Sequence, residues 1–240
     1  MSLQLSLNLR LKDASSFSNF LPAQNREVLA RLRAAIVAAA TAEKPEERML
    51  FLWGAPGSGK THLLQAACRL AQELGVSPVY VPLAEAENLS TSLLEDVEEM
   101  PLICLDDVER IAAQPAWESA LFSLSERLRG VSGTLVAAAA AGPNRIGLRM
   151  PELITRLAWG PVYQLQPMDD TEKLEAVRLR ARNRGFEIPP DVVHYILMRY
   201  PRDTHSLFDL LDRIDRASLT HRRRVTIPFL KSLEVADTET

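Results

Sequence analysis

The chain has 240 residues, of which 47% are hydrophobic, and it carries a formal net charge of -3 at pH 7. This length and apolar content suffice for one α/β domain with a small appended unit, and the slightly acidic balance argues against generic electrostatic binding to DNA, which requires a basic surface. No segment approaches the roughly 18 uncharged apolar residues of a membrane span, and the N-terminus lacks the order of a signal peptide. We therefore expect a cytoplasmic protein with no membrane partner, in which Cys68 and Cys104, both flanked by apolar residues, are free thiols.

The first 12 residues alternate leucine with mostly polar residues. Such alternation predicts an extended segment with its leucines on one side, and that side must be covered by the protein's own core or by a partner. A helical pattern then runs from about residue 24 to residue 40, and an acidic, proline-bearing linker over residues 43–48 ends it.

From residue 49 the chain alternates short apolar runs with amphipathic segments, a pattern that predicts a parallel sheet with crossover helices. The strands are expected at residues 49–53, 79–81, 102–105, 134–138 and 162–164. Helices are expected near residues 60–74, 89–98, 117–129 and 151–157. Beyond Pro167 the pattern becomes helical over residues 170–184, 191–199 and 204–220, before a short strand-like run at 225–227 and a last turn. The predicted fold class is therefore α/β, a parallel five-stranded sheet followed by a small all-helical unit.

Residues 54–61 read GAPGSGKT, which fits the phosphate-binding pattern G-x-x-x-x-G-K-[ST], the P-loop, between an apolar strand and a helix. Glycines let successive backbone N–H groups turn toward phosphate oxygens, and the helix that follows adds the positive end of its dipole. Lys60 is expected to reach the β- and γ-phosphates, and the Thr61 hydroxyl to ligate Mg²⁺. The predicted cofactor is ADP or ATP with Mg²⁺, bound by Gly54, Pro56, Gly57, Ser58, Gly59, Lys60 and Thr61.

A second part of the site is predicted where the apolar run 102–105 ends in Asp106 and Asp107. Asp106 would hold Mg²⁺ through water, and Asp107 would polarise the water that attacks the γ-phosphate. Paired acids at a strand end also serve as helix caps. The P-loop upstream is what favours the metal-site interpretation.

These residues resemble AAA+ proteins, and within them the DnaA-related family of bacterial replication proteins. The likeness covers nearly the whole chain: the P-loop, the Asp-Asp pair, the segment LITRLAWG at 153–160 and the helical C-terminal unit. Segments 174–186 and 211–228 are more similar to the Hda group of this family, which inactivates the initiator, than to DnaA itself.

The resemblance implies an AAA+ P-loop core followed by a helical lid. The expected divisions are an N-terminal segment at 1–22, the core at 23–167, the lid at 168–235 and a frayed tail at 236–240. Initiators of the family continue past the lid into a DNA-binding domain, whereas this chain ends there, so we expect no sequence-specific binding to the origin.

The N-terminal segment contains QLSLNL at residues 4–9, which is similar to the peptide by which bacterial partners bind the DNA sliding clamp, the beta subunit of DNA polymerase III. Gln4 would make hydrogen bonds at one end of the clamp's pocket, and Leu5, Leu7 and Leu9 would be its apolar anchors. DNA would then be reached only indirectly, through the clamp, and the protein would associate with the nucleoid in this way. An ordinary edge strand packed on its own core is the alternative interpretation.

Arg156 is the first residue of RLAWG at 156–160, which fits the family's segment R-[LF]-x-W-G, and in the family the arginine at this position resembles an arginine finger. The resemblance implies that Arg156 projects in trans toward the γ-phosphate held by a partner initiator, DnaA. A guanidinium there stabilises transition-state charge and raises phosphoryl-transfer rates by about 10³ to 10⁵. A surface arginine on a short helix is the alternative.

Two positions depart from an active ATPase of the family. A polar residue that senses the γ-phosphate usually ends the fourth core strand, but residues 137–141 are all alanine. On the lid, His205 stands where an arginine normally contacts phosphate, and an unperturbed histidine is mostly neutral at cytoplasmic pH. We therefore expect a chain that binds ADP well and hydrolyses ATP weakly or not at all by itself.

The function predicted on this basis is a negative regulator of replication initiation, which binds the sliding clamp and stimulates hydrolysis of DnaA-bound ATP through Arg156. A non-catalytic module that recruits DnaA and an autonomous ATPase of the helicase-loader type are the alternatives. A homodimer that hides Arg156 is a further alternative, because AAA+ proteins often assemble side by side.

Overall fold

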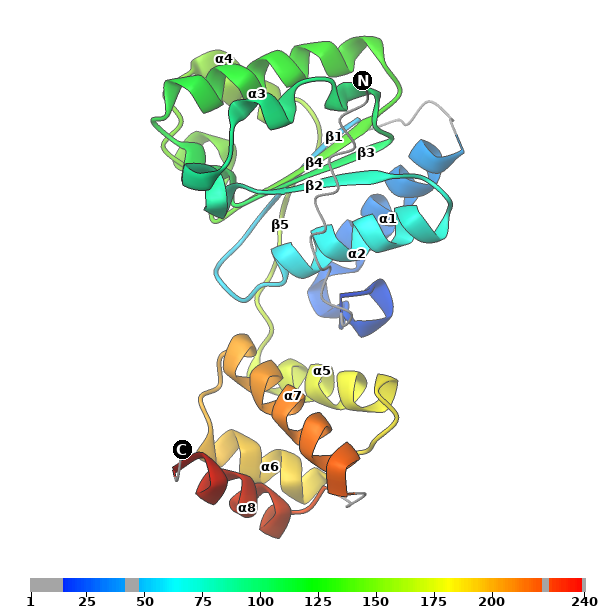
Figure 1. Cartoon of the computed structure of the whole chain (residues 1–240), viewed down its shortest axis with the longest axis vertical. Coiled ribbons are helices and arrows are strands. Elements are labelled where there is room, and N and C mark those ends of the chain that lie inside the picture. The colour runs from blue at the N-terminus through cyan, green and yellow to red at the C-terminus, as the bar shows by residue number, and fades with distance from the viewer. Residues whose placement is uncertain (1–14, 42–47, 222–224, 239–240) are drawn as a thin grey trace. The chain divides into compact units, whose positions relative to one another are not determined.

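A computed structural model describes residues 15–41, 48–221 and 225–238 of the chain. It divides into two compact units, of which the first ends at Pro167 and the second begins at Met168. Each unit is described by itself (Figure 1). None of the helices in the described ranges combines the length and apolar character that a membrane span requires.

The first unit is built on a five-stranded sheet whose paired strands are parallel, in the order β2-β3-β4-β1-β5. The strands are β1 (Met49–Trp53), β2 (Pro78–Pro82), β3 (Leu102–Asp106), β4 (Thr134–Ala139) and β5 (Val162–Gln164). All five lie where the apolar runs predict them, so the predicted fold class is confirmed. Central strands of a parallel sheet are covered on both faces, which is why β3 and β4 are continuous buried runs.

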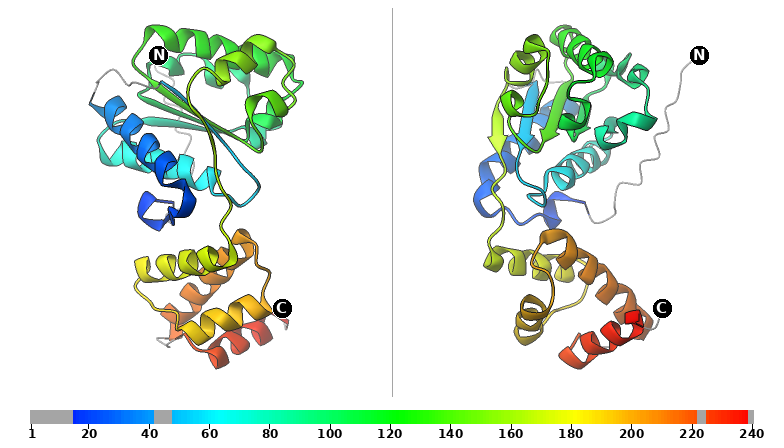
Figure 2. Two further views of the ribbon diagram at one scale, coloured as in Figure 1. Left: turned by 180° about the vertical axis from the view of Figure 1, so that it is seen from behind. Right: turned by 90° about the vertical axis from the view of Figure 1, so that its left-hand side faces the viewer.

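Helices cover both faces of this sheet (Figures 1 and 2). They are α1 (Arg26–Ala40), α2 (Lys60–Glu73), α3 (Pro115–Arg127) and α4 (Pro151–Leu157). Successive strand residues point to opposite faces, so Leu50 and Leu52 pack in the cluster formed with α1 and α2. Phe51 packs in the cluster formed with α3 and α4. The P-loop helix α2 and the helix that carries Arg156 therefore lie on opposite faces of the sheet.

The helix predicted over residues 89–98 does not form, and that prediction is wrong. The segment contains two short 3₁₀ turns, Thr91–Leu94 and Val97–Glu99. Extended backbone at Glu95 separates them, and Asp96 follows in the left-handed region with φ of 60°. The apolar spacing that suggested a helix instead buries one side chain from each turn, Leu94 and Val97.

In its described residues, 168–221 and 225–238, the second unit is a bundle of four helices around its own apolar core. They are α5 (Asp170–Asn183), α6 (Pro190–Arg199), α7 (Thr204–His221) and α8 (Ile227–Thr238). The predicted strand-like run at 225–227 is wrong, because Ile227 begins α8 and the Thr226 hydroxyl accepts the Phe229 N–H at 3.3 Å. Val225, Phe229 and Leu230 are buried at helical spacing, and α8 continues to Thr238.

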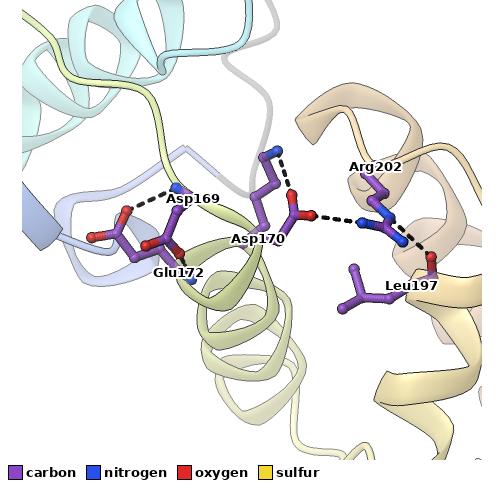
Figure 3. Close-up of polar contacts among 6 residues, drawn as sticks. Asp169, Asp170, Glu172, Leu197 and Arg202 are labelled. Carbon is purple, nitrogen blue, oxygen red and sulfur yellow. Dashed lines mark hydrogen bonds and ion pairs between the residues drawn. The ribbon is translucent and has the colours of Figure 1, made fainter.

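Polar contacts fix the start of α5 within this bundle (Figure 3). Asp169 and Glu172 form a reciprocal capping box, each side chain accepting the other's backbone N–H, at 2.8 and 2.9 Å. Asp170 accepts a hydrogen bond from Arg202 at 2.9 Å, and Arg202 also donates to the Leu197 carbonyl at 3.2 Å. The arginine thereby joins the first turn of α5 to the last turn of α6.

A buried glutamate positions the chain that leads into α4. Glu118 on α3 is only 2% exposed, and its carboxylate accepts backbone N–H groups from Ala113 at 2.8 Å, Arg149 at 2.9 Å and Met150 at 2.8 Å. One buried carboxylate therefore accepts three backbone N–H groups, from two segments that are 36 residues apart in the chain. Glu118 therefore fixes the loop from which α4 starts.

We expect the Glu118→Gln variant to lower the free energy of unfolding of the first unit by about 2–4 kcal/mol, because an amide keeps one acceptor oxygen and turns a buried NH₂ group toward backbone N–H donors. Chemical denaturation followed by circular dichroism measures the change. Glu27→Gln, an exposed glutamate on α1, is the matched control and should change stability by less than about 0.5 kcal/mol. An equally small loss for Glu118→Gln would contradict this role.

Candidate nucleotide-binding site

The P-loop connects β1 to α2, and its glycines are required by backbone geometry and by space. Gly57 and Gly59 have φ of 78° and 97°, in the left-handed region that other residues rarely adopt. A Cβ on Gly59 would lie 2.6 Å from the Phe20 ring, and one on Gly54 would lie 2.8 Å from the Leu165 carbonyl oxygen. The loop therefore holds a curved backbone pressed closely against its neighbours.

Lys60, the first residue of α2, is only 9% exposed. Its Nζ donates to the carbonyl oxygens of Gly54 at 2.8 Å and Ala55 at 3.3 Å, so the ammonium is held against the loop. The Ser58 hydroxyl is buried and, among the described residues, has no hydrogen-bond partner. The free N–H groups at the start of α2 add to these donors. A glycine cradle, a cation and an orphaned hydroxyl together fit a phosphate group.

Asp106, at the end of β3, is 1% exposed and lies against Thr61 of the P-loop. Burial raises the pKa of its carboxyl, and the hydrogen bond from the Thr61 hydroxyl opposes that rise. The Tyr80 hydroxyl donates to Asp106 Oδ2 at 2.8 Å, and the Asp107 N–H donates to Oδ1 at 3.1 Å. The two predicted Mg²⁺ ligands, Thr61 and Asp106, are thus together in the structure.

This donor set fits Mg²⁺ held partly by the nucleotide. Mg²⁺ usually takes one or two protein oxygens and completes its octahedron with phosphates and water. Within the described part of the chain there is no cluster of three or more histidine, cysteine, aspartate or glutamate side chains that could hold a metal ion by itself. Thr61 and Asp106 would then supply the protein's share of the coordination.

Sequence reasoning missed Tyr80, which orients the Asp106 carboxylate. Burial, followed by the nearby Asp106 charge, raises the pKa of Tyr80 far above its usual value, so the phenol remains a hydrogen-bond donor. The register of β2 on β3 pairs Tyr80 with Cys104 and Pro82 with Asp106. The proximity of Tyr80 to Asp106 follows from the pairing of β2 with β3, which the sequence alone does not give.

Asp107 follows β3 in the left-handed region, with φ of 57°, and starts a 3₁₀ turn, Val108–Ile111. This turn carries Glu109, also missed from sequence, to the end of β4, where its Oε2 accepts the Ala140 N–H at 3.2 Å. Residues 139–141, which end and follow β4, carry only methyl side chains. A side chain that could donate to a phosphate is therefore lacking at that strand end.

Arg156, in the last turn of α4, belongs to a surface cluster with Glu126, Arg129 and Trp159. Its Nε lies 2.5 Å from Glu126 Oε1, and its guanidinium carbon lies 4.9 Å from the centre of the Trp159 ring. Arg129 shares both neighbours, at 3.4 Å from Glu126 and 4.8 Å from the same ring. Trp159 is 60% exposed, which is unusual for so large an apolar side chain. We name these four residues the Trp159 cluster.

The remaining predicted residues lie in the second unit or outside the described part of the chain. His205 is exposed in the first turn of α7, where its Nε2 lies 3.2 Å from Asp209 Oδ2. The clamp-peptide residues, Gln4, Leu5, Leu7 and Leu9, lie outside the described residues.

The parallel sheet, its P-loop and the acidic end of β3 define a P-loop nucleotide-binding protein of the AAA+ class. The family model for the bacterial DnaA ATPase domain matches residues 11–164, and the model for the Hda lid domain matches residues 170–233. The chain belongs to the DnaA-related AAA+ family, and its lid is of the Hda kind.

Solved structures show the same fold at low sequence identity. Domain III of the Thermotoga maritima replication initiation protein DnaA is 20% identical, with a TM-score of 0.72, over 91% of this chain and 94% of that one. The replication initiator DnaA bound to AMPPCP and single-stranded DNA is 20% identical, with a TM-score of 0.69, over 85% of this chain and 65% of that one. The Thermotoga maritima RuvB branch migration motor is 19% identical, with a TM-score of 0.65, over 92% and 72%. The chain thus spans about two thirds of the longer initiator.

Proposed function

We propose that this chain is a DnaA-related regulator of replication that lowers initiation by stimulating hydrolysis of the ATP bound to DnaA. The observation that carries the proposal is the Trp159 cluster, in which Arg156 is presented at the surface beside an exposed tryptophan. Tryptophan and arginine dominate the binding energy of protein interfaces. Arg156 also lies on the sheet face opposite the chain's own P-loop helix, as expected for a residue that acts on a partner's nucleotide.

The chain's own site is proposed to bind ADP or ATP with Mg²⁺. Lys60 and the N-terminal N–H groups of α2 would bind phosphate oxygens, and Thr61 and Asp106 would hold the metal, directly or through water. Mg²⁺ supplies charge neutralisation between the phosphates when it is bound. The alanines at the end of β4 and the exposed His205 leave few groups that could respond to a third phosphate. We therefore expect ADP to be the resident nucleotide and the chain's own hydrolysis to be weak.

The partners proposed are DnaA and the DNA sliding clamp. Clamp binding through the N-terminal peptide would hold the chain on DNA and raise its local concentration near DnaA, since tethering converts a second binding event into an intramolecular one. The experiment that tests the whole proposal is the rate of hydrolysis of DnaA-bound ATP with clamp-loaded DNA, with and without this chain. No stimulation would favour a recruitment module or a helicase loader.

The double variant Gln4→Ala/Leu5→Ala is expected to lose clamp binding by at least about tenfold, because it removes the hydrogen-bonding head and one apolar anchor. Surface plasmon resonance on immobilised clamp measures this, and an ADP titration of the same variant should be unchanged. Ser2→Ala, within the same segment, is the matched control. Unaltered clamp affinity in the double variant would reject the clamp-peptide hypothesis and leave the nucleotide site standing.

A further inference from the structure

Glu109 brings a negative charge to the end of β4. The 3₁₀ turn Val108–Ile111 folds back from β3, and Glu109 Oε2 accepts the Ala140 N–H at 3.2 Å. None of the ion pairs found among the described residues involves Glu109. No lysine or arginine within that part of the chain therefore forms an ion pair with its carboxylate.

The end of β4 also adjoins the start of the P-loop. The Gly54 N–H donates to the Ala139 carbonyl at 3.3 Å, so the residue before Ala140 is bonded directly to the first residue of the loop. Strand β3 lies next to β4, with Leu105 opposite Ala137, so Asp106 ends on the same side of the sheet. Ligands of open α/β sheets bind at the carboxyl ends of the strands. Glu109 is thus bonded to the strand end that adjoins the first residue of the P-loop.

We propose that Glu109 is a specificity-determining residue that makes this site prefer a nucleoside diphosphate over a triphosphate. The inference rests on the proposed nucleotide binding and names the feature that would set its selectivity. Two effects act together. The carboxylate repels the additional negative charge of a third phosphate, and it occupies the Ala140 N–H, the backbone donor at a strand end whose side chains are all methyl groups.

Glu109→Gln separates charge from shape, because the amide keeps an oxygen acceptor for the Ala140 N–H. Isothermal titration with Mg-ADP and with the non-hydrolysable analogue Mg-AMPPCP gives two dissociation constants for each variant. We expect the ratio of the AMPPCP constant to the ADP constant to fall by about tenfold in Glu109→Gln, which corresponds to ~1.4 kcal/mol. The ADP constant itself should change by less than about twofold, and the shift should shrink as salt is added.

Glu109→Ala and Glu27→Gln complete the set. The alanine variant removes the charge and also frees the Ala140 N–H, so its ratio should fall at least as far as that of Glu109→Gln. Glu27→Gln, at an exposed position of α1, should leave the ratio unchanged. Thermal unfolding of each variant checks that it is folded.

The outcomes distinguish this inference from the proposed function. A ratio that stays the same in both Glu109 variants, or an equal loss of affinity for both nucleotides, overturns the selectivity role while the nucleotide site stands. A native chain that binds neither nucleotide rejects the site itself, and the inference with it.

Discussion

Replacing Arg156 by alanine is expected to lower the stimulated hydrolysis of DnaA-bound ATP by about 10³ or more, to the rate that DnaA shows alone. A guanidinium that reaches the γ-phosphate of a neighbouring subunit stabilises charge in the transition state, and its loss leaves no other group in that place. Binding to DnaA should fall only a few-fold, because the rest of the Trp159 cluster remains. Single-turnover hydrolysis of labelled ATP on DnaA, with clamp-loaded DNA, measures the rate.

The contacts of Arg156 make this an interpretable substitution. The side chain is 23% exposed and is held by Glu126 and Trp159, so in the chain alone it is restrained at the surface. In the proposed role, its ion pair with Glu126 would open as the guanidinium reaches a partner's nucleotide. Because the pair is partly exposed, its loss should lower stability by at most about 1 kcal/mol. Loss of stimulation would therefore report on the guanidinium and not on unfolding.

Arg129→Ala is the matched control, because Arg129 contacts the same carboxylate and the same ring. We expect this variant to keep stimulation within about threefold, since removing one surface cation weakens docking but removes no transition-state group. Equal loss in the two variants would indicate that the Trp159 cluster acts only in docking. Full stimulation by Arg156→Ala would reject the arginine finger and turn attention to another residue.

The parallel sheet was predictable because its signals are local. Each strand is an apolar run of five or so residues bounded by turn residues, and buried parallel strands need no alternation. The segment 89–98 was not predictable in the same way. Its apolar spacing fits a helix, but extended Glu95 and left-handed Asp96 split it into turns that are stabilised by packing Leu94 and Val97 on the core. Tertiary contact overrode a periodic pattern there.

The residues of the candidate site also divide into those that local sequence predicts and those that only tertiary contacts bring into place. The P-loop lies within eight consecutive residues, and the apolar run 102–105 predicts a buried strand that ends at Asp106. Tyr80, Glu109 and Glu118 act across distances of 26 to 32 residues in sequence, on Asp106, Ala140 and the loop before α4. Nothing in their own neighbourhoods marks them, since their partners are set by sheet register and by helix packing.

Replacing Lys60 by alanine is expected to weaken ADP binding by at least about 100-fold. Among the described residues, this ammonium is the side-chain cation held against the P-loop, at the Gly54 and Ala55 carbonyls, and a phosphate would draw it away from them. Thermal unfolding with and without ADP measures the effect, because ligand at 100 times its dissociation constant stabilises a protein by ~2.7 kcal/mol. Lys60→Ala should lose nearly all of that stabilisation.

Lys231→Ala, which removes a cation from the lid helix α8, is the control and should keep the ADP-induced stabilisation. An undiminished response in Lys60→Ala would show that ADP binds elsewhere. The variant also separates the two sites of the proposal, since Arg156 is intact in it. If Lys60→Ala still stimulates DnaA fully, the chain's own nucleotide is dispensable for the arginine finger. If stimulation disappears together with ADP binding, the bound nucleotide orders the surface that Arg156 presents, and the two faces of the sheet are coupled.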